Sequence, residues 1–297
     1  MKKKLLASIA ILALGTMVFT GCGSKKVEEA STATAETNQP ISAQETKKEG
    51  VKISIVGSTT VAEPMEKLVA KYKEMGNTDN LEVQGNGSSA GIKAAMEGTA
   101  DIGMSSRELK EEEKASGIEE TVIAYDGIAV VVHPSNGVED LTKAQIKDIF
   151  EGKITNWSEV GGIDKDIVVV TREAGSGTRG AFEEILKLLD ENKASTITEV
   201  ALVAEGTGTV MKTVATKEAS IGFVSEGFLD DTVKALKVDG TPCTVENVKG
   251  GTYAISRPLI LVNKSDVKPE AKAVIDFILG KEGQSIMAEK YIPVKND

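Results

Sequence analysis

Three times in this sequence an extended apolar segment ends in a short turn of glycine, serine and threonine and then begins an amphipathic helix. These turns are residues 57–60, 85–89 and 172–178. The first backbone N–H groups of a helix have no partner within the helix, and they carry the positive end of its dipole. One such turn is a common helix cap. Three in one chain, the third led by Arg172, predict a site for a small oxyanion held from several sides.

The apolar pattern alternates between strands and helices. Residues 51–55 alternate as a half-buried strand does, whereas 128–132 and 167–170 are continuous apolar runs typical of strands covered on both faces. Helical spacing follows at 61–72 and at 182–189. This order predicts an α/β fold with parallel sheets. Ligands of such sheets bind beyond the carboxyl ends of the strands, so the turns are expected to meet.

The beginning of the chain predicts an export signal. Lysines at 2–4 precede an apolar stretch that is short for a membrane span, so residues 1–21 are expected to be a signal peptide. Residues 19–22 resemble the lipobox of bacterial lipoproteins, with Phe19 in place of the usual leucine, and Cys22 is then the acylated residue, carrying lipid such as palmitate. An ordinary signal peptide with a chance cysteine is the alternative. Residues 22–50 have almost nothing to bury and predict a flexible tether.

Composition excludes several classes of function. The formal net charge is −10, which makes the chain a poor candidate for nucleic-acid binding. It has two cysteines, so lipid on Cys22 would leave Cys243 unpaired and no disulfide framework. Histidine and cysteine do not cluster with the spacing of metal ligands, so neither a metal nor a cofactor is expected.

Two motifs point toward other functions. The segment around Ser89 matches the G-x-S-x-G motif of serine hydrolases, which need a histidine as base, and the sequence has only His133. Residues 206–213 resemble the phosphate-binding loop of nucleotide hydrolases, but Met211 stands where the second glycine belongs. We interpret the lysine and threonine that follow as a solvated helix face.

Four segments together resemble the phosphate-binding proteins of bacterial phosphate-specific ABC importers. They are residues 57–62, 85–91, 101–107 and 172–179, and their order and spacing match across essentially the whole chain after the tether. The resemblance implies a two-lobed α/β fold of the type II periplasmic-binding-protein kind, with two crossover strands and a ligand cleft between the lobes. It implies that lobe one is 51–126 plus 254–297 and that lobe two is 127–253.

Carried over by position, the resemblance also implies a set of phosphate ligands. They are Thr59 and Thr60 in the first turn, Ser88 in the second, Ser106 after the strand at 101–105, and Arg172, Ser176, Gly177 and Thr178 in the third turn. The family often has an aspartate where Ser106 stands, and that carboxylate accepts the proton of hydrogen phosphate and rejects sulfate. A serine hydroxyl also accepts, so phosphate binding is expected while its selectivity over sulfate stays open. The family's acid beside the arginine is replaced by Ala174, which leaves Glu173 or another acid to orient Arg172.

These observations predict a lipid-anchored protein on the extracytoplasmic face of the cell membrane. It is expected to be a monomer that captures inorganic phosphate, closes, and delivers it to the permease and ATPase subunits of an ABC importer, without being an enzyme. Three alternatives stay open: the same fold binding sulfate or molybdate, a serine hydrolase using Ser89, and a surface sensor or adhesin without a transporter.

Overall fold

The computed structural model describes residues 50–294, which belong to one compact unit. The expected signal peptide, the lipidated Cys22 and the tether up to residue 49 lie outside the described residues. Within the described part, no helix has both the length and the apolar character needed to cross a membrane.

The described residues alternate strands and helices for most of their length. The strands are β1 (Lys52–Gly57), β2 (Asn80–Gly85), β3 (Ile102–Ser105), β4 (Ile118–Val132), β5 (Asp140–Leu141), β6 (Val168–Arg172), β7 (Leu202–Ala204), β8 (Ser220–Ser225), β9 (Lys234–Ala235), β10 (Lys237–Val238), β11 (Ser256–Lys264) and β12 (Ile292–Pro293). The helices are α1 (Thr59–Glu74), α2 (Ser88–Glu97), α3 (Glu111–Lys114), α4 (Lys143–Phe150), α5 (Gly177–Ile185), α6 (Thr207–Thr216), α7 (Val245–Lys249), α8 (Pro269–Leu279) and α9 (Lys281–Met287), with 3-10 turns η1 (Trp157–Val160) and η2 (Glu226–Phe228).

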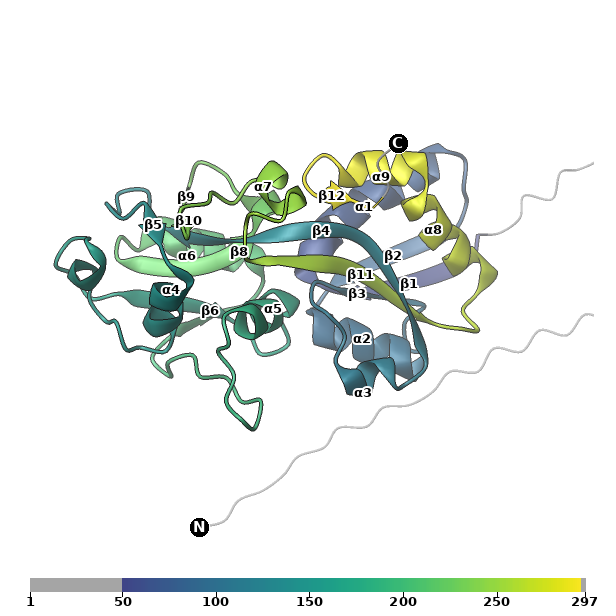
Figure 1. The fold of residues 1–297 in the computed structure, drawn as a ribbon. Helices are drawn as coiled ribbons and strands as arrows, with labels where there is room; N and C mark the ends of the chain where they lie inside the picture. Colours follow the sequence, from purple (N-terminus) through teal and green to yellow (C-terminus); the bar gives the residue numbers. More distant parts are fainter. Residues whose placement is uncertain (1–49, 295–297) are drawn as a thin grey trace, which may run out of the picture. The chain divides into compact units, whose positions relative to one another are not determined.

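The main sheet is mixed, not parallel throughout. Its strand order is β2-β1-β3-β11-β4-β8-β6-β7, and β9 and β12 also pair with β4. β1 is parallel to β2 and β3, and β6 is parallel to β7 and β8. Between these halves β11 and β4 run side by side and antiparallel (Figure 1). The expectation of parallel pairing was therefore right for each half and wrong for the centre, because apolar periodicity carries no information on strand direction.

Two large apolar clusters divide the described residues. The first contains Ile53 and Met65 together with Leu261 and Ile278, so both early and late segments of the chain build it. The second contains residues such as Phe150, Phe182 and Phe223. A smaller third cluster, which includes Ile92 of α2, covers the other face of the first cluster's sheet. We call the elements on the first and third clusters lobe one and those on the second lobe two. β4 belongs to both, with Ile123 in the first cluster and Val130 in the second. The residue boundaries given by the resemblance stay a prediction.

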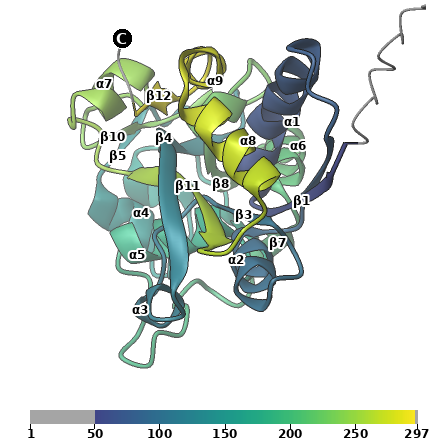
Figure 2. The ribbon, with the colours of Figure 1, turned by 90° about the vertical axis from the view of Figure 1, so that its right-hand side faces the viewer.

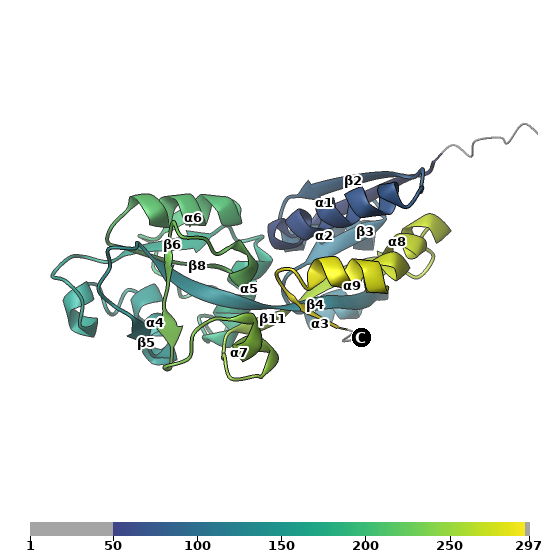
Figure 3. The same cartoon turned by 90° about the horizontal axis from the view of Figure 1, so that it is seen from above.

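Helices α1, α8 and α9 pack together in lobe one (Figures 2 and 3). Pro64 lies inside α1, where it cannot donate to the carbonyl of Thr60 one turn earlier. The hydroxyl of Tyr291 donates to that carbonyl instead, at 3.4 Å. Tyr291, close to the C-terminus, thereby holds the start of α1 in place.

The helix after the third turn is shorter than its apolar pattern predicts. α5 ends at Ile185, and Lys187 adopts a left-handed backbone with φ of 55°. Phe182 and Leu186 are buried as expected, but Leu189 is 37% exposed and forms a bridge with Ser195. The expectation that Leu189 lies on the buried helix face was wrong, because the backbone had already turned.

Candidate anion-binding site

Four helix starts meet beyond the carboxyl ends of parallel strands. Helix α1 begins at Thr59 after β1, α2 at Ser88 after β2, α5 at Gly177 after β6 and α6 at Thr207 after β7. Side-chain contacts join them in pairs across the two lobes. At each start the first N–H groups lack a partner within the helix, and the dipoles favour negative charge. The fourth start, at Thr207, was not among the predicted site residues.

Arg172 is the centre of these contacts. It is the last residue of β6 and is almost completely buried. Its Nη2 donates to Thr59 Oγ1 at 3.2 Å, and its Nη1 donates to Thr207 Oγ1 at 3.2 Å. The two threonine hydroxyls are 3.4 Å apart. One guanidinium therefore holds a hydroxyl from each lobe.

Glu173 orients this guanidinium. Its carboxylate accepts from Arg172 Nε at 2.8 Å and from Nη2 at 2.6 Å. Burial alone would raise the pKa of Glu173, but the hydrogen bonds and charge of Arg172 outweigh burial and lower that pKa. The acid therefore stays ionised at neutral pH and cancels the charge of Arg172. The sequence had left this role to Glu173 or to another acid, because Ala174 replaces the family's acid.

A second pair of hydroxyls crosses between the lobes. Thr60 in α1 and Thr178 in α5 place their Oγ1 atoms 3.2 Å apart, and both side chains are fully buried. Ser176 lies two residues before Thr178, and its side chain makes a different contact. Its Oγ caps α5 by accepting from the N–H of Arg179 at 3.2 Å. Ser176 is thus brought to the site, and its hydroxyl oxygen already accepts one hydrogen bond.

Serine hydroxyls form the lobe-one wall. Ser106 Oγ accepts from Ser58 Oγ at 2.9 Å and lies 3.4 Å from Ser88 Oγ. The Ser106 N–H donates to Ser88 Oγ at 3.1 Å. Gly177 of lobe two packs directly on this wall, because a methyl group built on its α-carbon would meet Ser88 Oγ at 2.1 Å. The ligand residues implied by the resemblance therefore lie in one cluster, and all of them except the partly exposed Thr59 are buried.

Sequence reasoning missed a buried ion pair at the base of this cluster. Arg257 at the start of β11 donates from Nη2 to Asp126 at 2.9 Å and from Nη2 to Thr60 Oγ1 at 3.3 Å. Burial raises the pKa of Asp126, while Arg257 and the Ser225 hydroxyl oppose that rise. The only available signal was a charged residue interrupting each of two apolar strands, which does not reveal that they pair.

The arrangement offers many donors, and its charges are balanced. Both arginines are neutralised by carboxylates, so hydroxyls, helix N–H groups and the outer edges of the guanidinium provide the attraction. A small oxyanion in such a place loses its water and needs a donor for each oxygen. Among residues 50–294, no cluster of three or more His, Cys, Asp or Glu side chains is placed to hold a metal ion.

Comparison with known proteins places this geometry in a family. The model of the PBP superfamily domain matches residues 28–282. The phosphate-binding protein PstS of Bacillus subtilis is 32% identical over 99% of this chain and 95% of its own length. The PstS protein of Borreliella burgdorferi is 30% identical over 80% of this chain and 88% of its own length.

The chain belongs to the PstS family of phosphate-binding proteins. Solved structures agree with this family. A candidate phosphate ABC transporter substrate-binding protein from Clostridium perfringens, crystallised with bound phosphate, is 48% identical, with a TM-score of 0.79 over 82% of this chain and all of its own. An ABC-type phosphate transport receptor from Vibrio cholerae is 38% identical, with a TM-score of 0.70 over 81% of this chain and 99% of its own. The predicted type II periplasmic-binding-protein fold is confirmed.

The hydrolase alternative is not favoured for this member of the PstS family. Ser89 Oγ accepts from Arg107 at 3.3 Å, while His133 Nδ1 pairs with Ser135 Oγ at 2.7 Å. The named relatives are substrate-binding transport proteins. The segment 206–213, which resembles a nucleotide-binding loop, does not act as a unit either. Lys212 is exposed, and Thr207 faces the site.

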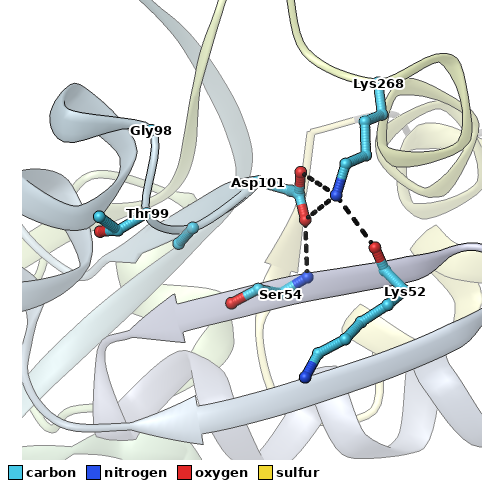
Figure 4. Close-up of a pocket in the computed structure, with 7 residues that line it drawn as sticks. Lys52, Ser54, Gly98, Thr99, Asp101 and Lys268 are labelled. Atoms are coloured by element: carbon cyan, nitrogen blue, oxygen red, sulfur yellow. Dashed lines mark hydrogen bonds and ion pairs between the residues drawn. The ribbon is translucent and has the colours of Figure 1, made fainter.

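Within residues 50–294, one pocket lies apart from this cluster and another borders it. One, of about 200 Å³, lies at the beginning of β1, and Figure 4 shows the ammonium of Lys268 between the Asp101 carboxylate, at 2.9 Å, and the Lys52 carbonyl, at 3.1 Å. Its charged side chains are paired with one another or with Glu82. The other, of about 550 Å³, borders the site between residues 107–112 of lobe one and 174–195 of lobe two.

Proposed function

We propose that this protein captures inorganic phosphate and delivers it to an ABC importer. The observation that carries the proposal is Arg172, which joins Thr59 of lobe one to Thr207 of lobe two within a buried cluster of hydroxyls and helix starts. The 48% identity to a protein solved with bound phosphate supports this choice of anion. Closing and opening of the lobes would let a buried site fill and empty.

The chemistry of the donors explains tight binding by an acidic protein. The net charge of −10 acts at long range, where salt screens it over roughly 10 Å. Oriented dipoles and a guanidinium act at contact distance in a buried site. Because the charge of Arg172 is already balanced by Glu173, hydrogen-bond donors contribute more to binding of the anion than net charge does.

Titration calorimetry tests the assignment. Wild-type protein should bind phosphate, and Arg172→Ala should weaken the affinity by about 100-fold or more, since two charge-assisted contacts are lost. Lys212→Ala is the matched control, because this side chain is exposed on α6 and should leave the affinity unchanged. Circular dichroism checks that each variant is folded. Equal affinity of wild type and Arg172→Ala would contradict the site, and no binding by wild type would contradict the function.

Competition measurements decide between oxyanions. Phosphate should displace sulfate and molybdate from the protein at pH 7. Ser106 offers a hydroxyl that can accept the proton of hydrogen phosphate, although it already accepts one hydrogen bond from Ser58. Sulfate binding as tight as phosphate binding across pH 5–8 would favour the same fold tuned to another anion.

We further propose that the protein acts as a monomer, anchored on the extracytoplasmic face by lipid on Cys22, and that the permease and ATPase subunits are its partners. The basic and apolar residues before Cys22 support the anchor. Cell fractionation should find the wild type in the membrane and Cys22→Ser in the soluble fraction. Cross-linking in membranes should recover a permease. Recovery of phosphate-binding protein without any transporter subunit would favour a surface sensor or adhesin.

A further inference from the structure

The buried pair of Arg257 and Asp126 occupies a distinctive place in the fold. The two residues lie directly opposite each other on the antiparallel strands β11 and β4, the strands that join the lobes. Arg257 Nε and Nη2 donate to one carboxylate oxygen of Asp126 at 3.1 and 2.9 Å. Both side chains are at most 1% exposed.

The pair contacts the lobe-one wall of the anion site and one strand of lobe two. Arg257 donates from Nη1 to the carbonyl of Ser106 at 3.0 Å and from Nη2 to Thr60 Oγ1 at 3.3 Å. The other oxygen of Asp126 accepts from the hydroxyl of Ser225, in β8 of lobe two, at 3.0 Å. The pair therefore contacts elements of lobe one and lobe two at once.

The contact with Thr60 constrains the direction of its single hydroxyl proton. A guanidinium only donates, so Thr60 Oγ1 must accept from Arg257 and turn its own proton elsewhere. The neighbouring polar atom is Thr178 Oγ1, at 3.2 Å across the site. Either hydroxyl can donate in this contact; when Thr60 donates, its proton points into the region where helices α1 and α5 begin, which is where an anion would lie.

Stability alone is a poor explanation for this pair. Desolvating two charges offsets much of their attraction, and apolar side chains of similar volume commonly hold two strands equally well. The carboxylate also cancels the charge that Arg257 would otherwise bring to the site. What remains is the directional effect of the guanidinium on Thr60 and on the Ser106 carbonyl.

We propose that Arg257 is a positioning residue of the anion site, which makes the Thr60 hydroxyl a fixed donor to the bound anion, with Asp126 as its neutralising partner. The proposal rests on the proposed function, since phosphate is the anion in question. Arg257 itself need not touch the phosphate.

A double-mutant cycle with phosphate calorimetry tests this role. Arg257→Lys and Thr60→Val should each weaken phosphate binding by about tenfold or more. The double variant should be no more than about threefold weaker than the weaker single variant, because both changes remove the same oriented hydroxyl. Arg107→Lys is the matched control. Arg107 is also buried and is paired with Glu113, but it does not contact Thr60. The fold-losses of affinity caused by Arg107→Lys and by Thr60→Val should therefore multiply in the double variant.

Each outcome decides something. Multiplicative losses for Arg257→Lys and Thr60→Val, or unchanged affinity in Arg257→Lys, would overturn the positioning role while leaving phosphate binding by the wild type intact. Absence of phosphate binding by the wild type would overturn the proposed function and this role with it. If Arg257→Lys does not fold, the neutral pair Arg257→Gln with Asp126→Asn leaves no unpaired charge, and the same cycle with Thr60→Val is measured on it.

Discussion

A methyl group on the α-carbon of Gly177 would lie 2.1 Å from the Oγ of Ser88 and 2.7 Å from the Oγ of Ser106. Gly177 begins α5 in lobe two, whereas both serines belong to lobe one. The lobes touch here at a distance that only glycine permits, so the approach of α5 to the serine wall depends on one missing side chain.

Gly177→Ala should therefore weaken phosphate binding by at least about tenfold, because a clash of this size has to be relieved by moving the lobes apart. Calorimetry measures the affinity. Gly175→Ala is the control, since a methyl group there would meet nothing within 4 Å. Equal affinity in the two variants would show that the contact between Gly177 and Ser88 is not needed for binding.

Thr207→Val should weaken phosphate binding by about tenfold. The variant keeps the shape of the side chain but removes the hydroxyl that accepts from Arg172 Nη1, which leaves a buried donor unpaired. Thr213→Val lies on the same helix, where its hydroxyl donates to the carbonyl of Thr209, and should leave the affinity unchanged. Similar losses in both variants would point to a general effect on α6.

Glu226 should make the protein less stable as the pH rises through neutrality. Burial, followed by the charges of Asp126 and Glu246, raises the pKa of Glu226 from 4.5 to about 7, against the opposing charge of Lys290. The folded protein then binds more protons than the unfolded chain between these values. The stabilising contribution is complete below pH 4.5 and is lost as the pH rises through 7.

Glu226→Gln removes this dependence. Because the side chain is partly exposed, solvent reduces the effect, and the wild type should lose roughly 1–2 kcal/mol relative to the variant between pH 5 and pH 8. Urea unfolding at both pH values, followed by circular dichroism, gives the difference. A wild type that gains stability relative to Glu226→Gln over this range would contradict the raised pKa.

Phe182→Ala should lower the free energy of unfolding by about 3–5 kcal/mol. The ring is fully buried and stacks on Phe223 with centroids 4.1 Å apart, so its removal leaves a cavity in lobe two. Urea unfolding without phosphate measures the loss. Val203→Ala, on a side chain that is 62% exposed, should change stability by about 0.5 kcal/mol or less. A small loss for Phe182→Ala would mean that the lobe repacks around the cavity.

Much of the site could be predicted from the sequence because its ligand groups are helix starts, and helix starts have local signatures. The turns before Thr59, Ser88 and Gly177 were recognised in this way, and the structure brings them together. Thr207 also begins a helix, and the apolar run at 200–204 precedes it, but the segment 206–213 was compared with a nucleotide-binding loop and set aside because Met211 replaces the second glycine.

The other missed feature is non-local. Asp126 and Arg257 are 131 positions apart, and their pairing depends on the register of β4 against β11. Sequence periodicity gives the existence of a buried strand but neither its direction nor its neighbour. The same limitation explains why the antiparallel centre of the sheet was not anticipated.

The position of β11 has a consequence for how the chain is made. This strand is translated after β8, yet it lies between β3 and β4 in the sheet. Most of lobe two can assemble early during synthesis, although Ile292 joins its core last. Lobe one has to wait until residue 264 and the helices behind it leave the ribosome. A product that stops before β11 would leave β3 and β4 with open edges, which makes incomplete chains prone to aggregation and easy for cellular proteases to remove.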